Sequence, residues 1–373
     1  ANASGDRFVT LDFVDPQIAV EVNNADVRLF EFIYLNGNFR FAKGAKHTVT
    51  VNTGIPANLG AALGTIGLDK LADDLAKVAG VTIGENFSTI SGLEVTSITV
   101  GASDVNAFIG IGDPDFTKPL DNQDLMGFGV TDLDFGLGIF KSTIPIKGLP
   151  TFTAMSADIG SMDLLGFDDI LELSTDRVQL RVNNGSKWFN AVGPPVIDFE
   201  ARFPGGEGVP VGLEVETGGE SVYLDFDGNR RIAVEVANAR VNLLDFVYLN
   251  GNFAFELGPT AIVNVNTGVS KDITDTIGIS NVIRGVEVST ITFGASDINA
   301  FIGLDGDEYF ENPDDNNAMG LAVEDLDFGL AMMRPTVFEF PGLEKLSPKF
   351  FALKARADRV GFVGLEPTLT MEV

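Results

Sequence analysis

The chain has 373 residues and a formal net charge of −28, and 45% of its residues are hydrophobic. A surface this acidic repels phosphate backbones and anionic lipids, so nucleic acid and bare membrane are not expected as partners. The hydrophobic content suffices for a packed core, and no apolar run reaches the length needed for membrane insertion.

The first distinctive phrase, VEVNNADVRLFEFIYLNGNF, begins at Val20 and returns as VEVANARVNLLDFVYLNGNF from Val234. Aligned without gaps, residues 18–54 and 232–268 are identical at 23 of 37 positions. Alternating apolar residues predict β-strands here. The runs on either side of Asn36 and Gly37 predict a two-residue hairpin turn, and the alternative is one long strand with a glycine bulge.

Residues 67–80 read GLDKLADDLAKVAG, with apolar side chains at helical spacing and a final glycine suited to a C-cap. We predict one amphipathic helix there, packed on the sheet. The matching part of the second copy is shorter, so the helix is interpreted as an insertion in the first copy, with a partner-facing role as the alternative.

The repeat continues after this insertion in a new register. GASDVNAFIG at residues 101–110 returns as GASDINAFIG at 294–303, and DLDFGL at 132–137 returns at 325–330. More loosely, residues 152–167 correspond to 350–365. The pattern indicates a tandem duplication with a unit of about 200 residues, the size of a whole domain.

A smaller motif inside each unit has a small residue, an aspartate and then alternating apolar positions. We expect the aspartate to lie in the turn that opens each strand and to bond its own backbone; metal ligation and a solvated edge are the alternatives. Residues 204–220, rich in glycine, proline and glutamate, are interpreted as a linker or exposed turn.

These elements predict an all-β fold of two tandem homologous β-domains. Each would be built of antiparallel strands, as a sandwich or an elongated solenoid-like stack. The first domain is expected at residues 1–214 and the second at 215–373. The second is expected to be incomplete at its C-terminal end, because residues 176–203 have no counterpart in it.

Nucleophilic catalysis of the Ser-His-Asp or Cys-His kind requires an imidazole or a thiol. The chain has no cysteine, and its single histidine, His47, corresponds to Ala261 in the second copy. We therefore predict a protein that is not an enzyme. A carboxylate pair acting on a glycoside remains the enzymatic alternative.

Acidic loops occupy residues 110–127 and 303–320, at equal length in the two copies. Several carboxylates in one short loop repel one another, and a hard cation such as calcium removes that repulsion and gains oxygen ligands. Neither loop has EF-hand spacing, and a solvated acidic loop is the alternative. The expected calcium ligands are Asp113, Asp115, Asp121, Asp124, Asp305, Asp307, Asp314 and Asp315.

The phrases LLDFVYLNGNFAFE, ITFGASDINAFIG, VEDLDFGLAMM and KFFALKARAD resemble repeat units of very large secreted or cell-surface bacterial proteins. Such units are described as calcium-binding, adhesin-like or RTX-associated. The resemblance implies an extracellular structural or adhesive array stiffened by calcium. The chain lacks the Gly-Gly-x-Gly-x-Asp nonapeptides of RTX coils.

We therefore expect a secreted or cell-surface structural module, part of a fibre, surface layer or giant adhesin. Its partners would be neighbouring repeats, identical protomers or cell-surface glycans. One alternative is a filament subunit whose incomplete second unit accepts a strand from residues 2–12 of a neighbour. The other is a carbohydrate-binding or carbohydrate-cleaving domain that uses Trp188 or the tyrosines.

Overall fold

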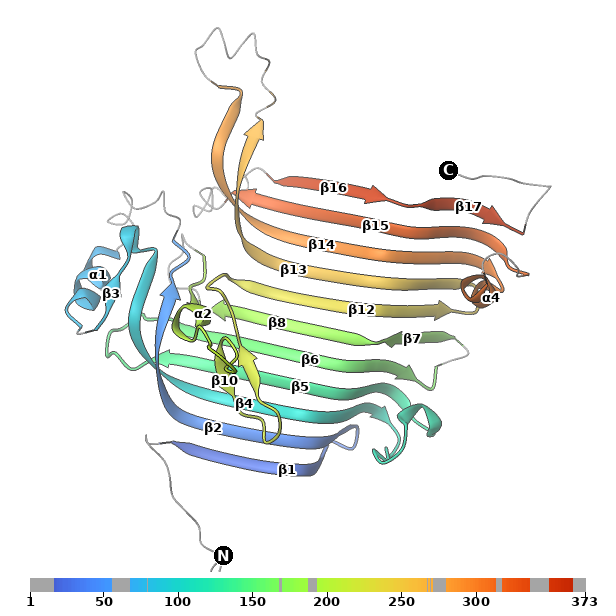
Figure 1. The fold of residues 1–373 in the computed structure, drawn as a ribbon, viewed down its shortest axis with the longest axis horizontal. Coiled ribbons are helices and arrows are strands. Elements are labelled where there is room, and N and C mark those ends of the chain that lie inside the picture. The colour runs from blue at the N-terminus through green and yellow to red at the C-terminus, as the bar shows by residue number, and fades with distance from the viewer. Residues whose placement is uncertain are drawn as a thin grey trace, which may run out of the picture.

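The computed structural model describes residues 17–55, 68–78, 80–167, 170–186, 193–266, 268, 270, 280–312, 317–335 and 349–364. Within these residues the chain is all-β, which confirms the predicted class. Fifteen strands form one antiparallel sheet, and two further strands form a small separate sheet (Figure 1). No helix in this part of the chain is long and apolar enough to cross a membrane.

Strands make up most of the described structure, and the helices are few and short. The strands are β1 (Ile18–Leu29), β2 (Ile33–Asn52), β3 (Thr82–Ile83), β4 (Thr89–Ile111), β5 (Met126–Ser142), β6 (Thr151–Leu165), β7 (Leu171–Thr175), β8 (Arg177–Gly185), β9 (Val196–Asp198), β10 (Leu213–Val215), β11 (Val222–Leu224), β12 (Arg231–Leu243), β13 (Val247–Asn266), β14 (Val282–Leu304), β15 (Met319–Pro335), β16 (Phe350–Arg356) and β17 (Arg359–Val363). The α-helices are α1 (Leu68–Ala76), α2 (Phe199–Arg202) and α4 (Gly306–Glu311), and short 3₁₀ turns occupy Glu85–Phe87 and Leu120–Asn122.

Both repeats belong to the same sheet. Its order is β1-β2-β4-β5-β6-β7-β12-β13-β14-β15-β16, with β8 pairing with both β6 and β12. The junction is therefore a continuous ladder in which Val178 of β8 lies opposite Val236 of β12. The expected boundary at residues 214 and 215 falls inside β10, which packs on the first repeat.

The repeats keep the same strand register. In the first repeat Val51 lies opposite Ile90, and in the second Val265 lies opposite Ile283. In the same way Phe140 pairs with Phe152, and Met333 pairs with Phe350. The sequence alignment of the two copies is thus also an alignment of ladder positions.

The hairpin turn predicted at Asn36 and Gly37 is wrong, and the alternative of a long strand with a bulge is correct. The reversal comes earlier, at residues 30–32, where Phe30 and Glu31 have positive φ. Gly37 lies within β2, near its beginning, at a register shift. A Cβ on Gly37 would lie 2.7 Å from a methyl carbon of Val105, so the neighbouring strand leaves room only for glycine.

The interpretation of residues 204–220 as a linker or exposed turn holds for residues 206–211, which form an exposed turn, and is wrong for the residues that follow. Leu213, Val215 and Thr217 are buried, because β10 and β11 form a hairpin that lies on one face of the sheet. We call residues 196–226, which comprise β9, α2, β10 and β11, the cover segment, and the face it packs on the covered face. Figure 1 shows the β10–β11 hairpin crossing in front of β4 and β5.

The main core lies between the cover segment and the first repeat. Phe140 and Phe152 of the sheet contact Phe199 and Leu224 of the cover segment within one buried cluster. Helix α1 lies within the segment expected to be helical, and its Leu75 is fully buried in the same cluster. Smaller clusters around Phe108 and Phe301 occupy the far ends of the long strands.

The opposite face of the sheet carries apolar side chains that remain exposed along both repeats. Alternation from the covered face assigns them to this side. Equivalent positions show the same exposure: Ile109 and Ile302 are each 47% exposed, and Met126 and Met319 are 45% and 46% exposed. The exposure is thus a property of the repeat.

Candidate functional site

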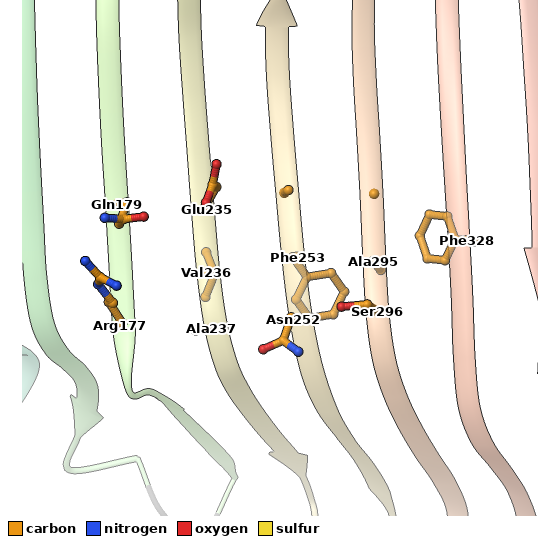
Figure 2. A pocket seen from close by; sticks show the side chains of 12 residues that line it. Arg177, Gln179, Glu235, Val236, Ala237, Asn252, Phe253, Ala295, Ser296 and Phe328 are labelled. Carbon is orange, nitrogen blue, oxygen red and sulfur yellow. The ribbon is translucent and has the colours of Figure 1, made fainter. Parts of the chain in front are cut away.

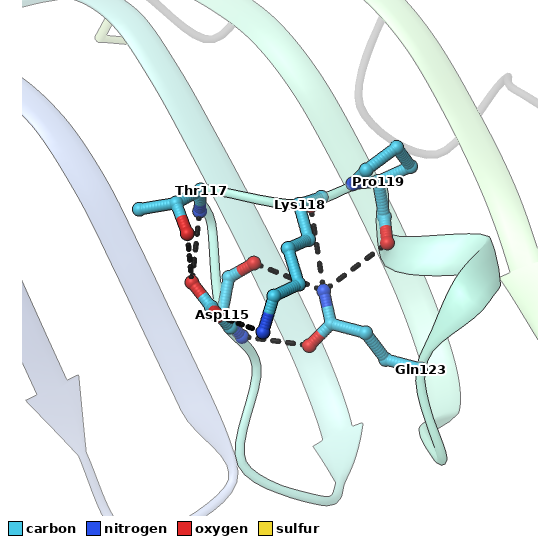
Figure 3. A network of polar contacts seen from close by, with 5 residues as sticks. All are labelled: Asp115, Thr117, Lys118, Pro119 and Gln123. Carbon is cyan, nitrogen blue, oxygen red and sulfur yellow. Dashed lines mark hydrogen bonds and ion pairs between the residues drawn. The ribbon is translucent and has the colours of Figure 1, made fainter.

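The acidic loop of the first repeat is held by ion pairs and hydrogen bonds within the chain. Asp115 lies 2.7 Å from Lys118 Nζ and accepts hydrogen bonds from the Thr117 backbone N–H at 3.1 Å and the Thr117 hydroxyl at 2.5 Å. The Gln123 amide group bridges the Asp115 backbone N–H and C=O (Figure 3). The hydrogen bonds from Lys118 and Thr117 lower the pKa of Asp115 to about 2.

The other ligands predicted in this loop point in different directions. Asp113 is largely exposed and lies 3.7 Å from an Arg28 nitrogen. Asp121 accepts a hydrogen bond from the neighbouring Asn122 side chain, and Asp124 is exposed.

In the second loop, Asp305 has positive φ after β14, and Asp307 lies in the first turn of α4. Asp314 and Asp315 fall outside the described residues. Over the part of the chain that the structure describes, no three acidic, histidine or cysteine side chains gather in a way that could hold a metal ion. The calcium assignment therefore stays a prediction.

A row of asparagine and aspartate residues crosses the sheet perpendicular to its strands. In the first repeat the Asn24 backbone N–H donates to Asn38 Oδ1 at 3.0 Å, and Asn38 Nδ2 donates to Asp104 Oδ2 at 2.9 Å. The Asp104 backbone N–H then donates to Asp134 Oδ1 at 2.9 Å. We call these four residues and their equivalents in the second repeat the polar row.

The second repeat reproduces the row residue by residue. The Asn238 backbone N–H donates to Asn252 at 3.0 Å, and Asn252 Nδ2 donates to Asp297 at 2.9 Å. The Asp297 backbone N–H donates to Asp327 at 3.2 Å. At the junction, Asp176 accepts a hydrogen bond from Asn238 and pairs with Arg240, so the polar contacts continue between the repeats.

The expectation that the recurrent aspartates open strands is confirmed for Asp176 before β8 and Asp358 before β17. It is wrong for the aspartates along the polar row, which mark a line of bulges inside strands. Asp104 lies within β4 and Asp132 within β5, with φ of 54° and 55°, and Asp297 and Asp325 repeat this in β14 and β15. Asparagine and aspartate tolerate this left-handed conformation better than other residues with side chains. The bulges interrupt the ladders at equivalent points in both repeats.

Desolvation and neighbouring carboxylates raise the pKa of Asp134 in the polar row and of Asp325 beside it. Burial raises the pKa of Asp134 first, and the charges of Asp132, Asp104 and Glu220 add to the effect. Burial likewise raises the pKa of Asp325, with further contributions from neighbouring carboxylates. Both groups accordingly resist ionisation more than an isolated aspartate in water.

The histidine considered for catalysis and the described tyrosines considered for sugar binding lie within or beside packed side chains. His47 bonds the Ser97 hydroxyl at 3.1 Å and packs edge-on against Phe140 and Phe203 at the margin of the core. Tyr34 and Tyr248 are buried, which removes them as an exposed platform for sugars. Trp188 lies outside the described residues.

The covered face of the second repeat has a shallow groove where the first repeat carries its cover segment. One part, of about 450 Å³, is bordered by Arg177, Glu235 and Asn252 (Figure 2). A neighbouring part of about 410 Å³ has small residues along several strands, among them Ala233, Ala254, Gly294, Gly329, Ala331 and Ala352. Sequence reasoning missed this groove, although the shared glycines of the two copies could have indicated it.

Comparison with family models, curated proteins and solved structures found no match for this chain. The fold, the polar row and the groove therefore supply the argument for function.

Proposed function

We propose that this chain is a non-enzymatic structural module of an extracellular array, in which each repeat adds strands to one continuous antiparallel sheet. The observation that carries this proposal is the ladder between β8 and β12, which joins the repeats through seven residue pairs from Arg231–Asn183 to Ala237–Arg177. A tether between independent domains does not require such a ladder.

The repeated features support a scaffold. Equivalent residues keep the strand register and the polar row, whereas His47 has Ala261 as its counterpart. A reaction that depended on His47 could not be shared by the two copies. The net charge of −28 and the absence of cysteine fit an exported protein that remains soluble at high local concentration.

Calcium stabilisation is a separate part of the proposal. Its support is the acidity of the two loops, and extracellular modules often bind calcium with dissociation constants of about 10⁻⁴ to 10⁻³ M. The structural role does not depend on it, because the ladder and the polar row need no ion. The carbohydrate alternative gains no supporting observation from the described tyrosines.

A chain carrying a third repeat tests the structural role. Six strand positions, from β1 through β8, make up one repeat, and strands lie about 4.8 Å apart, so each added repeat should lengthen the particle by about 29 Å. Small-angle X-ray scattering should show this increment with a rigid-body profile. A profile of separate units on flexible connections would overturn the proposal.

A further inference from the structure

Two glycines of the first repeat lie directly beneath the cover segment. A Cβ on Gly101 would lie 2.2 Å from the Glu216 carbonyl oxygen, and one on Gly136 would lie 3.1 Å from the Cβ atoms of Val215 and Val222. Both glycines are therefore explained by the close approach of the β10–β11 hairpin.

The second repeat keeps both glycines, and no described residue forms a hairpin over them. Gly294 corresponds to Gly101 and Gly329 to Gly136. Among the described residues, the nearest atom to a Cβ on Gly294 is a backbone oxygen at 3.9 Å, and no atom lies within 4 Å of a Cβ on Gly329. Neither has positive φ, so no contact or conformation in this structure demands glycine there. Glycines at these two positions fit a groove built for a hairpin that docks.

The first repeat also shows which side chains such a hairpin presents. Strand β11 and the two residues after it read VYLDF, residues 222–226, with Leu224 fully buried and Phe226 2% exposed. Residues 9–13 read VTLDF. Five residues, 227–231, lie between the first segment and Ile232, and four, 14–17, lie between the second segment and the equivalent Ile18.

Strand order decides which repeat each segment can cover. Strand β11 contacts β5 and β6, so the segment before β12 covers the repeat that precedes β12 in the sheet. By the same relation, residues 9–13 would cover a repeat preceding β1, and within the described residues no strand lies beyond β1.

The groove of the same molecule is too far away for residues 9–13 to reach. Strand β13 is seven strand positions from β1, which corresponds to about 34 Å at a spacing of about 4.8 Å. Four connecting residues span at most about 14 Å. Residues 9–13 can therefore reach this groove only from a second molecule.

We propose that the groove at Gly329 binds residues 9–13 of a second copy of this chain, which joins molecules head to tail. Val9 would lie over Gly329 as Val222 lies over Gly136, and Leu11 would take the place of Leu224. The inference rests on the proposed structural role and names the contact that extends the array. Docking would bring β1 of one copy toward the β16–β17 edge of the next.

Disulfide trapping tests the contact, because the natural chain has no cysteine. Protein carrying Val9→Cys is mixed with protein carrying Gly329→Cys under mild oxidation, and a mixed dimer is expected. Thr10→Cys with Gly329→Cys is the matched control. Its equivalent, Tyr223, alternates to the other side of β11, so we expect at least tenfold slower cross-linking.

The second measurement is self-association, followed by analytical ultracentrifugation of the natural protein and of single variants that carry no added cysteine. Leu11→Asp should weaken self-association at least tenfold, and Gly329→Val should do the same by filling the groove. Gly329→Val should leave the melting temperature of dilute protein unchanged, because its Cβ meets no atom within 4 Å. Thr10→Asp should leave association unchanged.

The inference is overturned if Val9→Cys cross-links no faster than Thr10→Cys, or if the natural protein stays monomeric at all concentrations. Either result leaves the structural role intact when the three-repeat chain still extends as a rigid sheet. If the three-repeat chain instead scatters as separate units on flexible connections while Val9→Cys still cross-links specifically, the structural role is contradicted and the contact between copies is supported.

Discussion

An isoleucine occupies the equivalent ladder position in each repeat, and among the described residues only the one in the first repeat is covered. Ile90 is 1% exposed and lies opposite Val51, whereas Ile283 is 54% exposed and lies opposite Val265. Replacing each by alanine compares a covered with an uncovered position at constant strand pairing. The comparison measures what the cover segment and α1 contribute to the first repeat.

The structure sets the expected magnitudes. Truncating a buried isoleucine to alanine costs about 2–5 kcal/mol, because it removes buried surface and leaves a cavity. At Ile283 about half of the side chain already contacts water, so the loss should be about 1 kcal/mol at roughly 0.8 kcal/mol per buried methylene. Ile90→Ala should therefore lower the free energy of unfolding by at least about 1 kcal/mol more than Ile283→Ala.

Native-state hydrogen exchange is the suitable assay, because one-step unfolding is typical of domains much shorter than this chain and exchange resolves local opening. Amides of β2 and β4 report on Ile90, and amides of β13 and β14 report on Ile283. Val95 and Val288 are both fully buried, so Val95→Ala and Val288→Ala should cost the same. Equal losses for the two isoleucines in dilute protein would refute the reasoning about the cover.

Three further predictions concern the polar groups. Asn38→Asp removes the donor to Asp104 and places two carboxylates together, so it should destabilise the protein by about 1–3 kcal/mol at pH 7, and the loss measured by urea unfolding should shrink below about pH 4. The pKa of Asp115 is lowered to about 2, so the stabilisation that its ionised carboxylate gives is complete above the pKa of an unfolded carboxyl group and is lost as the pH falls toward 2. Carboxyl carbon NMR should show this titration, and Lys118→Met should raise the pKa of Asp115. An unshifted titration in Lys118→Met would show that Lys118 does not cause the lowered pKa. If the acidic loops hold calcium, chelation should lower the melting temperature, and a melt unchanged by chelator would remove calcium from the proposal.

The strands and their repeat could be predicted because alternation and duplication are local properties of the sequence. The bulge at Gly37 could not, since Asn-Gly suits a hairpin turn equally well and only the methyl of Val105 on the adjacent strand decides between them. Likewise, the Gly and Pro content of residues 204–220 masked the alternation of Leu213, Val215 and Thr217, whose burial depends on the sheet beneath.

The predicted acidic site illustrates a similar limit. Loop composition gathers Asp113, Asp115, Asp121 and Asp124 in the sequence, but the directions of their side chains depend on Lys118, Arg28 and the backbone turns. The groove could not be predicted from the sequence for a different reason. A glycine kept in two copies indicates close approach, yet only the structure shows that, within the described residues, the approaching hairpin lies over the first copy alone.

A disulfide across the junction tests the central claim, that both repeats form one sheet, most directly. Val178 and Val236 are opposite one another in the β8–β12 ladder, and such pairs have Cα separations of about 4.5–5.5 Å, within the range of disulfides. Val178→Cys with Val236→Cys should close an intramolecular disulfide rapidly, and the mismatched pair Val178→Cys with Val241→Cys should not. Two thiols that stay free in the matched pair would contradict a shared sheet.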